Sequence, residues 1–199
     1  MTLPSSTPAT PVRRRFPGWL IAVIIAGSVL ALVFCAIMVI GVLTLLGQKV
    51  TPTAITADDG KSQVTVPGTW QKLSNLNDEA DLQAGYPRQE QYLIVLTESK
   101  VDLVDIDLEA YAELILQKLT SSLQSPQISE PRNLTINGRP AIQYEVRGIV
   151  KNLNVVYWLT SVEGAKHFHQ VLAWTLASKV ETNQPVLREV IESFHEVGQ

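Results

Sequence analysis

The fold is decided by residues 133–162, which read NLTINGRPAIQYEVRGIVKNLNVVYWLTSV. Asn137-Gly138 is a strong hairpin signal, because both residues tolerate the positive φ angles of a tight turn, and Lys151-Asn152 can reverse the chain again. Between these turns apolar and polar residues alternate, so that the two kinds face opposite ways. The apolar ones are Ile142, Tyr144 and Val146, and the polar ones are Gln143, Glu145 and Arg147. The segment predicts three antiparallel strands, over residues 133–136, 140–150 and 153–162.

Toward the C-terminus the meander continues into one more strand and a closing helix. Glu163-Gly164 predicts a turn, and residues 166–178 predict a strand with Phe168, Leu172, Trp174 and Leu176 on one face. For the helix we expect a cap at Thr182 or Asn183 and Pro185 in the first turn, where proline is tolerated. The buried stripe of this helix is expected to contain Val186, Leu187, Val190, Ile191 and Phe194.

Toward the N-terminus the same reading gives strands and an amphipathic helix. Residues 62–66 predict a short strand that ends at Pro67-Gly68, because proline cannot donate to a strand ladder. Residues 81–86 and 91–98 predict two further strands, and a helix is expected from an N-cap at Asp107 to near Gln124. This order of elements predicts an α+β fold, in which an antiparallel sheet is flanked by helices.

A long apolar run lies closer to the N-terminus. No charged residue occurs between Arg15 and Lys49, and the 28 residues from Trp19 to Leu46 are almost wholly apolar. As a helix they would extend about 42 Å, whereas a bilayer core of about 30 Å needs only about 20 residues. We therefore predict one transmembrane helix over residues 18–47. A cleaved signal peptide would have a shorter apolar core of about 7–15 residues followed by a small-residue cleavage site, and neither feature fits this run.

Small residues within the predicted span indicate a possible contact with another helix. Gly27, Ala31 and Cys35 recur every four residues, which would let a second helix approach closely. Cys35 is the one cysteine of the chain, so the region after the span has no disulfide and no thiol chemistry. Lipidation of Cys35 is not favoured, because Phe34 stands where a small residue is expected.

Charge sets the expected orientation. Arg13, Arg14 and Arg15 precede the apolar run and only Lys49 directly follows it, and basic residues stay on the cytoplasmic side. We expect a disordered cytoplasmic tail over residues 1–17, a linker over 48–60 and an extracytoplasmic domain over 61–199, in a cell membrane. All 19 acidic residues but only 12 of the 16 basic ones follow residue 52. This acidic outer region argues against nucleic-acid binding.

Three segments in this order resemble a known family. They are Val66-Pro67-Gly68-Thr69-Trp70, Leu134-Thr135-Ile136-Asn137-Gly138-Arg139-Pro140-Ala141 and Ile191-Glu192-Ser193-Phe194. With the strands and helices between them, they resemble the PsbP-like α-β-α sandwich over about residues 60–197. The resemblance implies a non-enzymatic binding or assembly-assisting domain. Unlike the photosystem II subunit that gives the family its name, this chain carries a predicted anchor, so the resemblance is to a membrane-anchored bacterial member.

The sequence offers few residues for chemistry. It has no Gly-x-Ser-x-Gly turn and no Gly-rich phosphate loop, so we predict no catalytic and no cofactor-binding residues. His167 and His169 lie two apart on a predicted strand and therefore project from one face, where they could be two metal ligands. A third ligand would have to come from elsewhere, such as His195, Glu163 or Glu192. The alternative is that both histidines lie on a polar, half-covered face beside Lys166.

We therefore predict a membrane-tethered, extracytoplasmic and non-catalytic domain that binds a protein or an envelope component. Two alternatives stay open: a metal-dependent envelope hydrolase that uses His167 and His169, and a small-molecule or lipid carrier, which would require a sizeable apolar cavity. Trp70, Trp158 and Trp174 are expected in the core, whereas a shared exposed face would mark a partner surface.

Overall fold

The structure is a computed structural model that describes residues 51–103 and 105–197. The predicted tail 1–17, the predicted transmembrane helix 18–47 and the small residues Gly27, Ala31 and Cys35 lie outside these described residues. Within the described ranges, no helix is both long enough and apolar enough to cross a membrane. Contacts divide the chain into two compact units, of which the second is Val50–Gln199.

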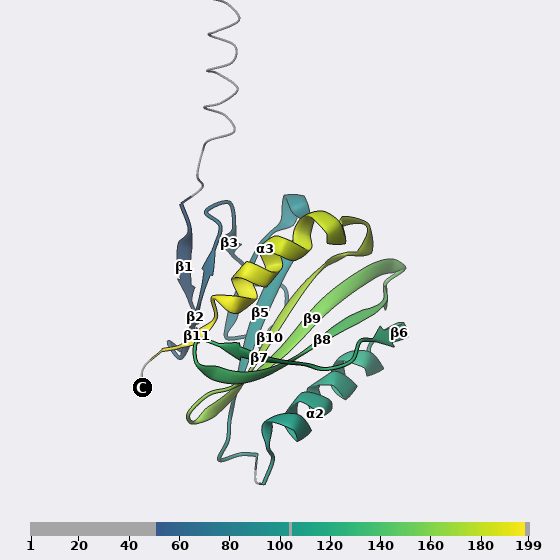
Figure 1. Ribbon diagram of the computed structural model, residues 1–199. Coiled ribbons are helices and arrows are strands. Elements are labelled where there is room, and N and C mark those ends of the chain that lie inside the picture. The colour runs from purple at the N-terminus through teal and green to yellow at the C-terminus, as the bar shows by residue number, and fades with distance from the viewer. Residues whose placement is uncertain (1–50, 104, 198–199) are drawn as a thin grey trace, which may run out of the picture. The chain divides into compact units, whose positions relative to one another are not determined.

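An eight-stranded antiparallel sheet forms the centre of the second unit (Figure 1). Seven strands pair in the order β3-β4-β5-β10-β9-β8-β6, and β7 also pairs with β8. In chain order the strands are β3 (Gln71–Lys72), β4 (Leu82–Tyr86), β5 (Gln91–Ser99), β6 (Gln124–Ile128), β7 (Arg132–Ile136), β8 (Arg139–Val150), β9 (Leu153–Glu163) and β10 (His167–Leu176). The predicted meander is confirmed, because β7 to β10 follow one another in the chain and each pairs antiparallel with the next.

The two turns that set this meander have the predicted backbone. Asn137 and Gly138 have φ angles of 46° and 79°, and Lys151 and Asn152 have φ angles of 49° and 66°. Positive φ at both central residues is the property for which asparagine and glycine are selected in two-residue hairpins. The resulting register places Ile142, Tyr144 and Val146 opposite Ser161, Leu159 and Tyr157 of β9.

Two helices cover opposite faces of the sheet (Figure 1). Helix α2 (Leu108–Ser121) packs on β8 and β9, and α3 (Val180–Glu192) packs on β10 and β5. Alternate residues of β10 show the division, because Phe168 lies in the core beneath α2 whereas Val171 and Ala173 lie in the core beneath α3. Asp107 is the N-cap of α2 as predicted, and its carboxylate accepts a hydrogen bond from the Ala110 N–H at 2.8 Å. The α+β prediction is therefore confirmed.

A smaller sheet packs on the α3 side. It has the order β1-β2-β11, with β1 (Thr53–Thr56), β2 (Ser62–Val66) and β11 (His195–Glu196). Ile55, Val64 and Val66 share one core with Leu187 of α3. Residues 53–56 of the predicted linker 48–60 are therefore a strand of the folded unit.

The start of the closing helix differs from the prediction. Helix α3 begins at Val180, directly after a 3-10 turn over Ala177–Lys179, so Pro185 lies inside the helix and not in its first turn. Asn183 does not cap the helix, because its side chain is fully buried and hydrogen-bonds to the sheet. Sequence reasoning also missed β6, whose five residues are all exposed and include a proline, a residue that sheets tolerate at an edge.

Candidate functional site

His167 and His169 lie at the start of β10 and face the α3 side of the sheet, with ring centroids 5.9 Å apart. Their predicted projection from one face is therefore confirmed. The His169 ring lies 5.1 Å from that of Phe194 and is fully buried, whereas 20% of the His167 side chain is exposed. The alternative of a half-covered polar face thus describes His167 but not His169.

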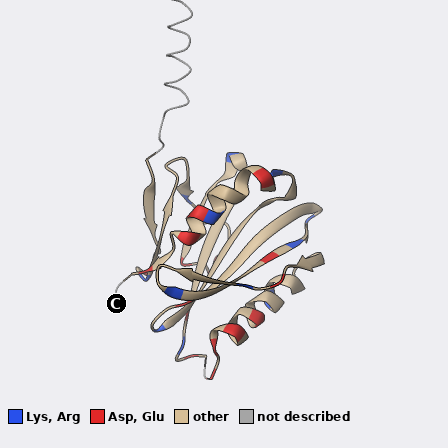
Figure 2. Ribbon diagram, viewed as in Figure 1, with Lys and Arg blue, Asp and Glu red and all other residues tan. Residues whose placement is uncertain are grey.

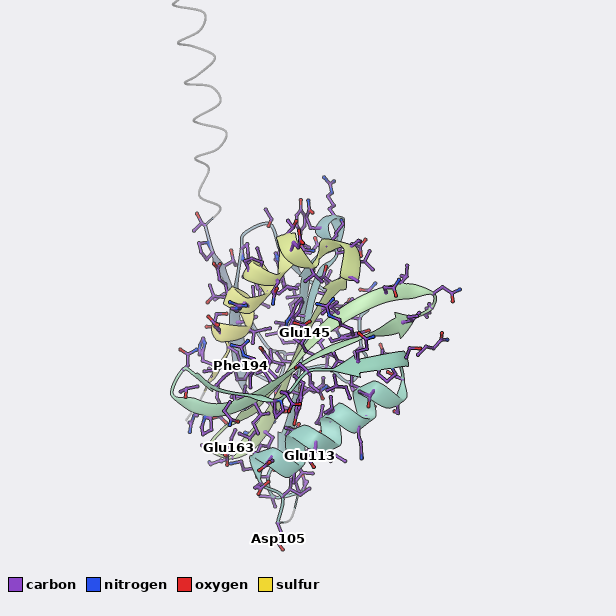
Figure 3. All side chains as sticks on the ribbon, turned by 45° about the vertical axis from the view of Figure 1, so that its right-hand side comes forward. Asp105, Glu113, Glu145, Glu163 and Phe194 are labelled. Atoms are coloured by element: carbon purple, nitrogen blue, oxygen red, sulfur yellow. The ribbon has the colours of Figure 1, made fainter. Side chains whose placement is uncertain are left out.

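The residue that joins the two histidines is Glu196, from β11. Its Oε1 lies 3.3 Å from His167 Nδ1 and 3.6 Å from His169 Nε2. Of the third ligands proposed from the sequence, Glu163 is paired with Lys100 Nζ at 2.6 Å, and His195 Nδ1 contacts the Ser193 carbonyl at 3.3 Å. Glu192 is an exposed residue at the end of α3 and does not belong to the cluster. Glu163 and Phe194, labelled in Figure 3, mark the end of the sheet where this cluster lies. A two-residue strand has no periodicity, so no sequence signal placed Glu196 here.

The backbone at Gly164 and Ala165 lies close against the Glu196 carboxylate. A Cβ at Gly164 would lie 2.7 Å from Oε1 and 2.9 Å from Cδ, so any larger residue there would displace the side chain. Oε2 accepts a hydrogen bond from the Ala165 N–H at 3.0 Å and lies 3.3 Å from Arg139 Nη2. The turn after β9 and the β7–β8 hairpin therefore orient the carboxylate so that Oε1 faces both imidazoles.

The cluster holds an ionised carboxylate beside a neutral imidazole. Burial lowers the pKa of His169, because desolvation disfavours the charged ring, and this outweighs the opposing attraction of Glu196. Burial also acts to raise the pKa of Glu196, but the Ala165 N–H and the two imidazoles outweigh it, and that pKa lies below its ordinary value. Neutral imidazole and ionised carboxylate are the protonation states in which these side chains bind metal ions.

A cleft of about 220 Å³ lies between α3 and strands β7, β8 and β9, and the segment before β7 also lines it. Trp158 lies at its base and is 5% exposed. The lining residues are Ser129, Glu130, Arg132, Gln143, Glu145, Trp158, Gln184, Arg188 and Ile191. Figure 2 shows that the strands and the helix around it carry both basic and acidic residues, and Glu145 is labelled in Figure 3.

The charged groups of the cleft differ in their pairing. Glu145 is held by Arg147, whose Nη2 lies 2.7 Å from Oε1. Arg132 and Arg188 are both exposed and form no ion pair within the described ranges. Sequence reasoning singled out neither arginine, because Arg132 lies on β7 and Arg188 on α3, and their proximity depends on how α3 packs on the sheet. These two guanidinium groups are available to an external carboxylate.

A buried polar network fixes the position of α3 over the sheet. Asn183 Nδ2 donates to Thr175 Oγ1 and to the Gln89 carbonyl, both at 2.7 Å, and Asn183 Oδ1 accepts from Gln91 Nε2 at 2.8 Å. Gln91 Oε1 in turn accepts from Trp70 Nε1 at 3.0 Å. The same helix carries Arg188 at the cleft's edge, so the network holds in place the helix that forms one side of the cleft.

The three tryptophans do not share one exposed face. Trp70 and Trp158 are 6% and 5% exposed, so both belong to the core on the α3 side. Trp174 lies on the other face, half-buried, with its ring stacked on Tyr92 at a centroid distance of 5.4 Å. The prediction that tryptophans serve the core is confirmed for Trp70 and Trp158.

Comparison with known proteins identifies the fold. No family model and no curated protein matches the sequence. Among solved structures, LpqN of Mycobacterium tuberculosis is 17% identical with a TM-score of 0.53, over 74% of this chain and 91% of that one. The cyanobacterial PsbP protein CyanoP of Synechocystis is 10% identical with a TM-score of 0.52, over 74% and 93%. The Ran-binding protein Mog1p of Saccharomyces cerevisiae is 14% identical with a TM-score of 0.53, over 74% and 96%.

The class of fold is therefore PsbP-like, as the resemblance implied. The first of these neighbours is described as involved in cell envelope biogenesis, and the last as a Ran-binding protein. At this level of identity the likeness concerns the arrangement of the strands and helices and not the residues of a site.

Proposed function

We propose that this chain is a membrane-tethered, extracytoplasmic binding domain without catalytic activity, and that a protein partner binds in the cleft between α3 and β8. The proposal rests on finding a tryptophan and two arginines together in that cleft. A buried tryptophan forms its base, and two arginines without an ion-pair partner in the described residues lie at its edge. Tryptophan and arginine are the residues most enriched among those that dominate binding energies.

The size of the cleft favours a protein over a small cofactor. Its volume of about 220 Å³ is below the roughly 300–1,000 Å³ of sites that enclose drug-sized ligands. It can accept one or two side chains of a partner against Trp158. A carboxylate on the same partner segment would then pair with Arg132 or Arg188, in the bidentate geometry that guanidinium groups favour.

The proposal of a membrane tether is supported by the sequence. The run from Trp19 to Leu46 is long enough to span a bilayer, and the three arginines before it favour a cytoplasmic N-terminus. The folded domain would then lie outside the cell membrane and would present its cleft to proteins or components of the envelope.

The two alternative functions find less support in the side chains. A hydrolase needs a site that a substrate can reach, whereas the side chains of His169 and Glu196 are 0% and 7% exposed. A lipid carrier needs an apolar cavity, whereas about half of the residues that line a second cavity of about 560 Å³, at the β8–β9 turn, are polar. The polar residues of this lining include Ser125, Gln127, Arg147, Asn152 and Asn154.

A crosslinking pull-down from native membranes tests the proposal. The full-length chain is compared with its Arg132→Glu, Arg188→Glu double variant and with Lys118→Glu, a single charge reversal on α2, which covers the opposite face of the sheet. A partner that copurifies with the wild-type chain and with Lys118→Glu, but not with the double variant, supports binding in the cleft. The purified partner should also bind a chain that lacks residues 1–47, since that chain keeps the cleft. Equal capture by all three forms would show that the cleft is not the binding site.

A further inference from the structure

We propose that His167, His169 and Glu196 bind one divalent transition-metal ion, zinc(II) by the chemistry of these ligands, and that this ion fastens the three-stranded sheet to the eight-stranded sheet. The site is distinct from the cleft and independent of the function proposed for it. The two histidines belong to β10 of the large sheet, and the glutamate belongs to β11 of the small one.

The distances fit a shared metal ion. Zinc bonds of about 2.0–2.2 Å at tetrahedral angles place neighbouring ligand atoms roughly 3.3–3.6 Å apart. Glu196 Oε1 lies 3.3 Å from His167 Nδ1 and 3.6 Å from His169 Nε2. One ligand atom from each of the three residues lies within 4.8 Å of the other two. Small rotations of the His167 ring, the one with an exposed edge, would complete the geometry.

The ligand types favour zinc. Two imidazole nitrogens with one carboxylate form a common zinc ligand set, whereas calcium and magnesium prefer oxygen ligands alone. The orientation of the His169 ring is fixed by a contact on its other nitrogen, because Nδ1 lies 3.2 Å from Thr97 Oγ1. Metal-binding histidines usually have such a polar partner on the second ring nitrogen, and it fixes which nitrogen faces the metal.

A buried nitrogen atom without a hydrogen-bond partner is independent evidence for a ligand. His169 Nε2 is buried and has no hydrogen-bond partner among the described residues, since 3.6 Å to Glu196 Oε1 is too long for a hydrogen bond. Buried polar atoms are nearly always satisfied, and a metal ion between Nε2 and Oε1 would satisfy this one. Ser62, which lies directly across the β2–β11 ladder from Glu196, also has a buried hydroxyl without a partner in this part of the chain.

The burial of the site argues for a structural role. The side chain of His169 is fully buried and that of Glu196 nearly so, which leaves the partly exposed His167 as the side from which an ion can enter. Among the described residues, strand β11 comprises His195 and Glu196 and pairs with two residues of β2, and one further backbone hydrogen bond joins the Val197 N–H to the Lys61 carbonyl. A metal bond to Glu196 would therefore hold the C-terminal strand far more firmly than its own ladder does.

Zinc titration of the full-length protein tests the proposal. The protein, purified in detergent without a histidine tag and stripped of metal with a chelator, is titrated with zinc sulfate and followed by calorimetry, metal analysis and thermal unfolding. We expect one zinc per chain and a higher melting temperature in zinc. The His167→Ala and Glu196→Gln variants should each lose binding by at least about tenfold, and Thr97→Val, which removes the orienting hydroxyl, by about 10–100-fold.

His195→Ala is the matched control, because His195 lies beside Glu196 in the chain but contacts the Ser193 carbonyl instead of the cluster. It should bind zinc as the wild-type chain does. The His167 side chain is partly exposed, so its variant should fold, and circular dichroism verifies this. The proposal is overturned if the wild-type chain retains no zinc, if His167→Ala binds it equally well, or if His195→Ala loses it.

Discussion

Replacing Asn183 with alanine should loosen α3 from the sheet. The side chain is fully buried and makes three hydrogen bonds, to Gln91, Thr175 and the Gln89 carbonyl. Each such bond contributes about 0.5–1.5 kcal/mol net, and a buried partner left unsatisfied costs about 1–3 kcal/mol. In the variant, Gln91 Nε2 would lose its acceptor. The Gln91 amide could not turn over to find another, because its Oε1 accepts a hydrogen bond from Trp70. We therefore expect a loss of about 3 kcal/mol in the free energy of unfolding.

The assay is urea and thermal unfolding of residues 51–199, with Asn154→Ala as the control. Asn154 is an exposed residue of β9, so its removal should change stability by less than about 0.5 kcal/mol. For Asn183→Ala the melting temperature should fall by about 6–12 °C, at about 2–4 °C per kcal/mol for a domain of this size. A double-mutant cycle with Gln91→Ala should give a coupling energy of about 1 kcal/mol or more. A loss below about 1 kcal/mol would refute the idea that this network positions α3.

Three further predictions follow from the same physical reasoning. Gly164→Ala should destabilise the domain by about 1–3 kcal/mol, because its Cβ would overlap a buried carboxylate, and an unchanged unfolding midpoint would contradict this. Asp107→Ala should cost about 1 kcal/mol by removing the N-cap of α2; Asp107→Asn, which keeps the acceptor, should restore most of that stability in the same urea titration. In a Cys35→Ser background, a membrane-impermeant maleimide should label Asn154→Cys but not Ser6→Cys in intact cells, and the reverse pattern would show the opposite orientation.

Local signals in the sequence predicted the sheet well. The hairpins at Asn137-Gly138 and Lys151-Asn152 could be predicted because positive φ at two successive residues is a local requirement. The cap at Asp107 could be predicted because a side-chain acceptor three residues before a free N–H is a local contact. The alternation of side chains along β8 then determined which of its residues packed on each face of the sheet.

The elements that escaped prediction depend on contacts between distant residues. Helix α3 begins at Val180 and not near Asn183, because the asparagine is used to bond Gln91, which is 92 residues earlier in the chain. Strands β1 and β11 are too short for a period to be recognised, and both exist because β2 lies between them.

For the candidate sites too, local features could be predicted from the sequence and contacts between distant residues could not. The two histidines could be placed on one face, because side chains alternate along any strand. Their partner could not be identified, because Glu196 reaches them only after α3 has returned the chain to β2. The cleft at Trp158 likewise depends on Arg132 and Arg188, whose proximity depends on how α3 packs on the sheet.

The most direct test of the binding function is photocrosslinking from the cleft itself. A photoreactive amino acid replaces Gln184, which lines the cleft, in the full-length chain, or Lys118 on α2 as the control, and the protein is irradiated in native membranes. The cleft is the docking site of a protein partner if position 184 gives a discrete adduct that position 118 does not give. If neither position gives an adduct, or if both give the same one, the partner does not bind in this cleft and the proposed function is wrong.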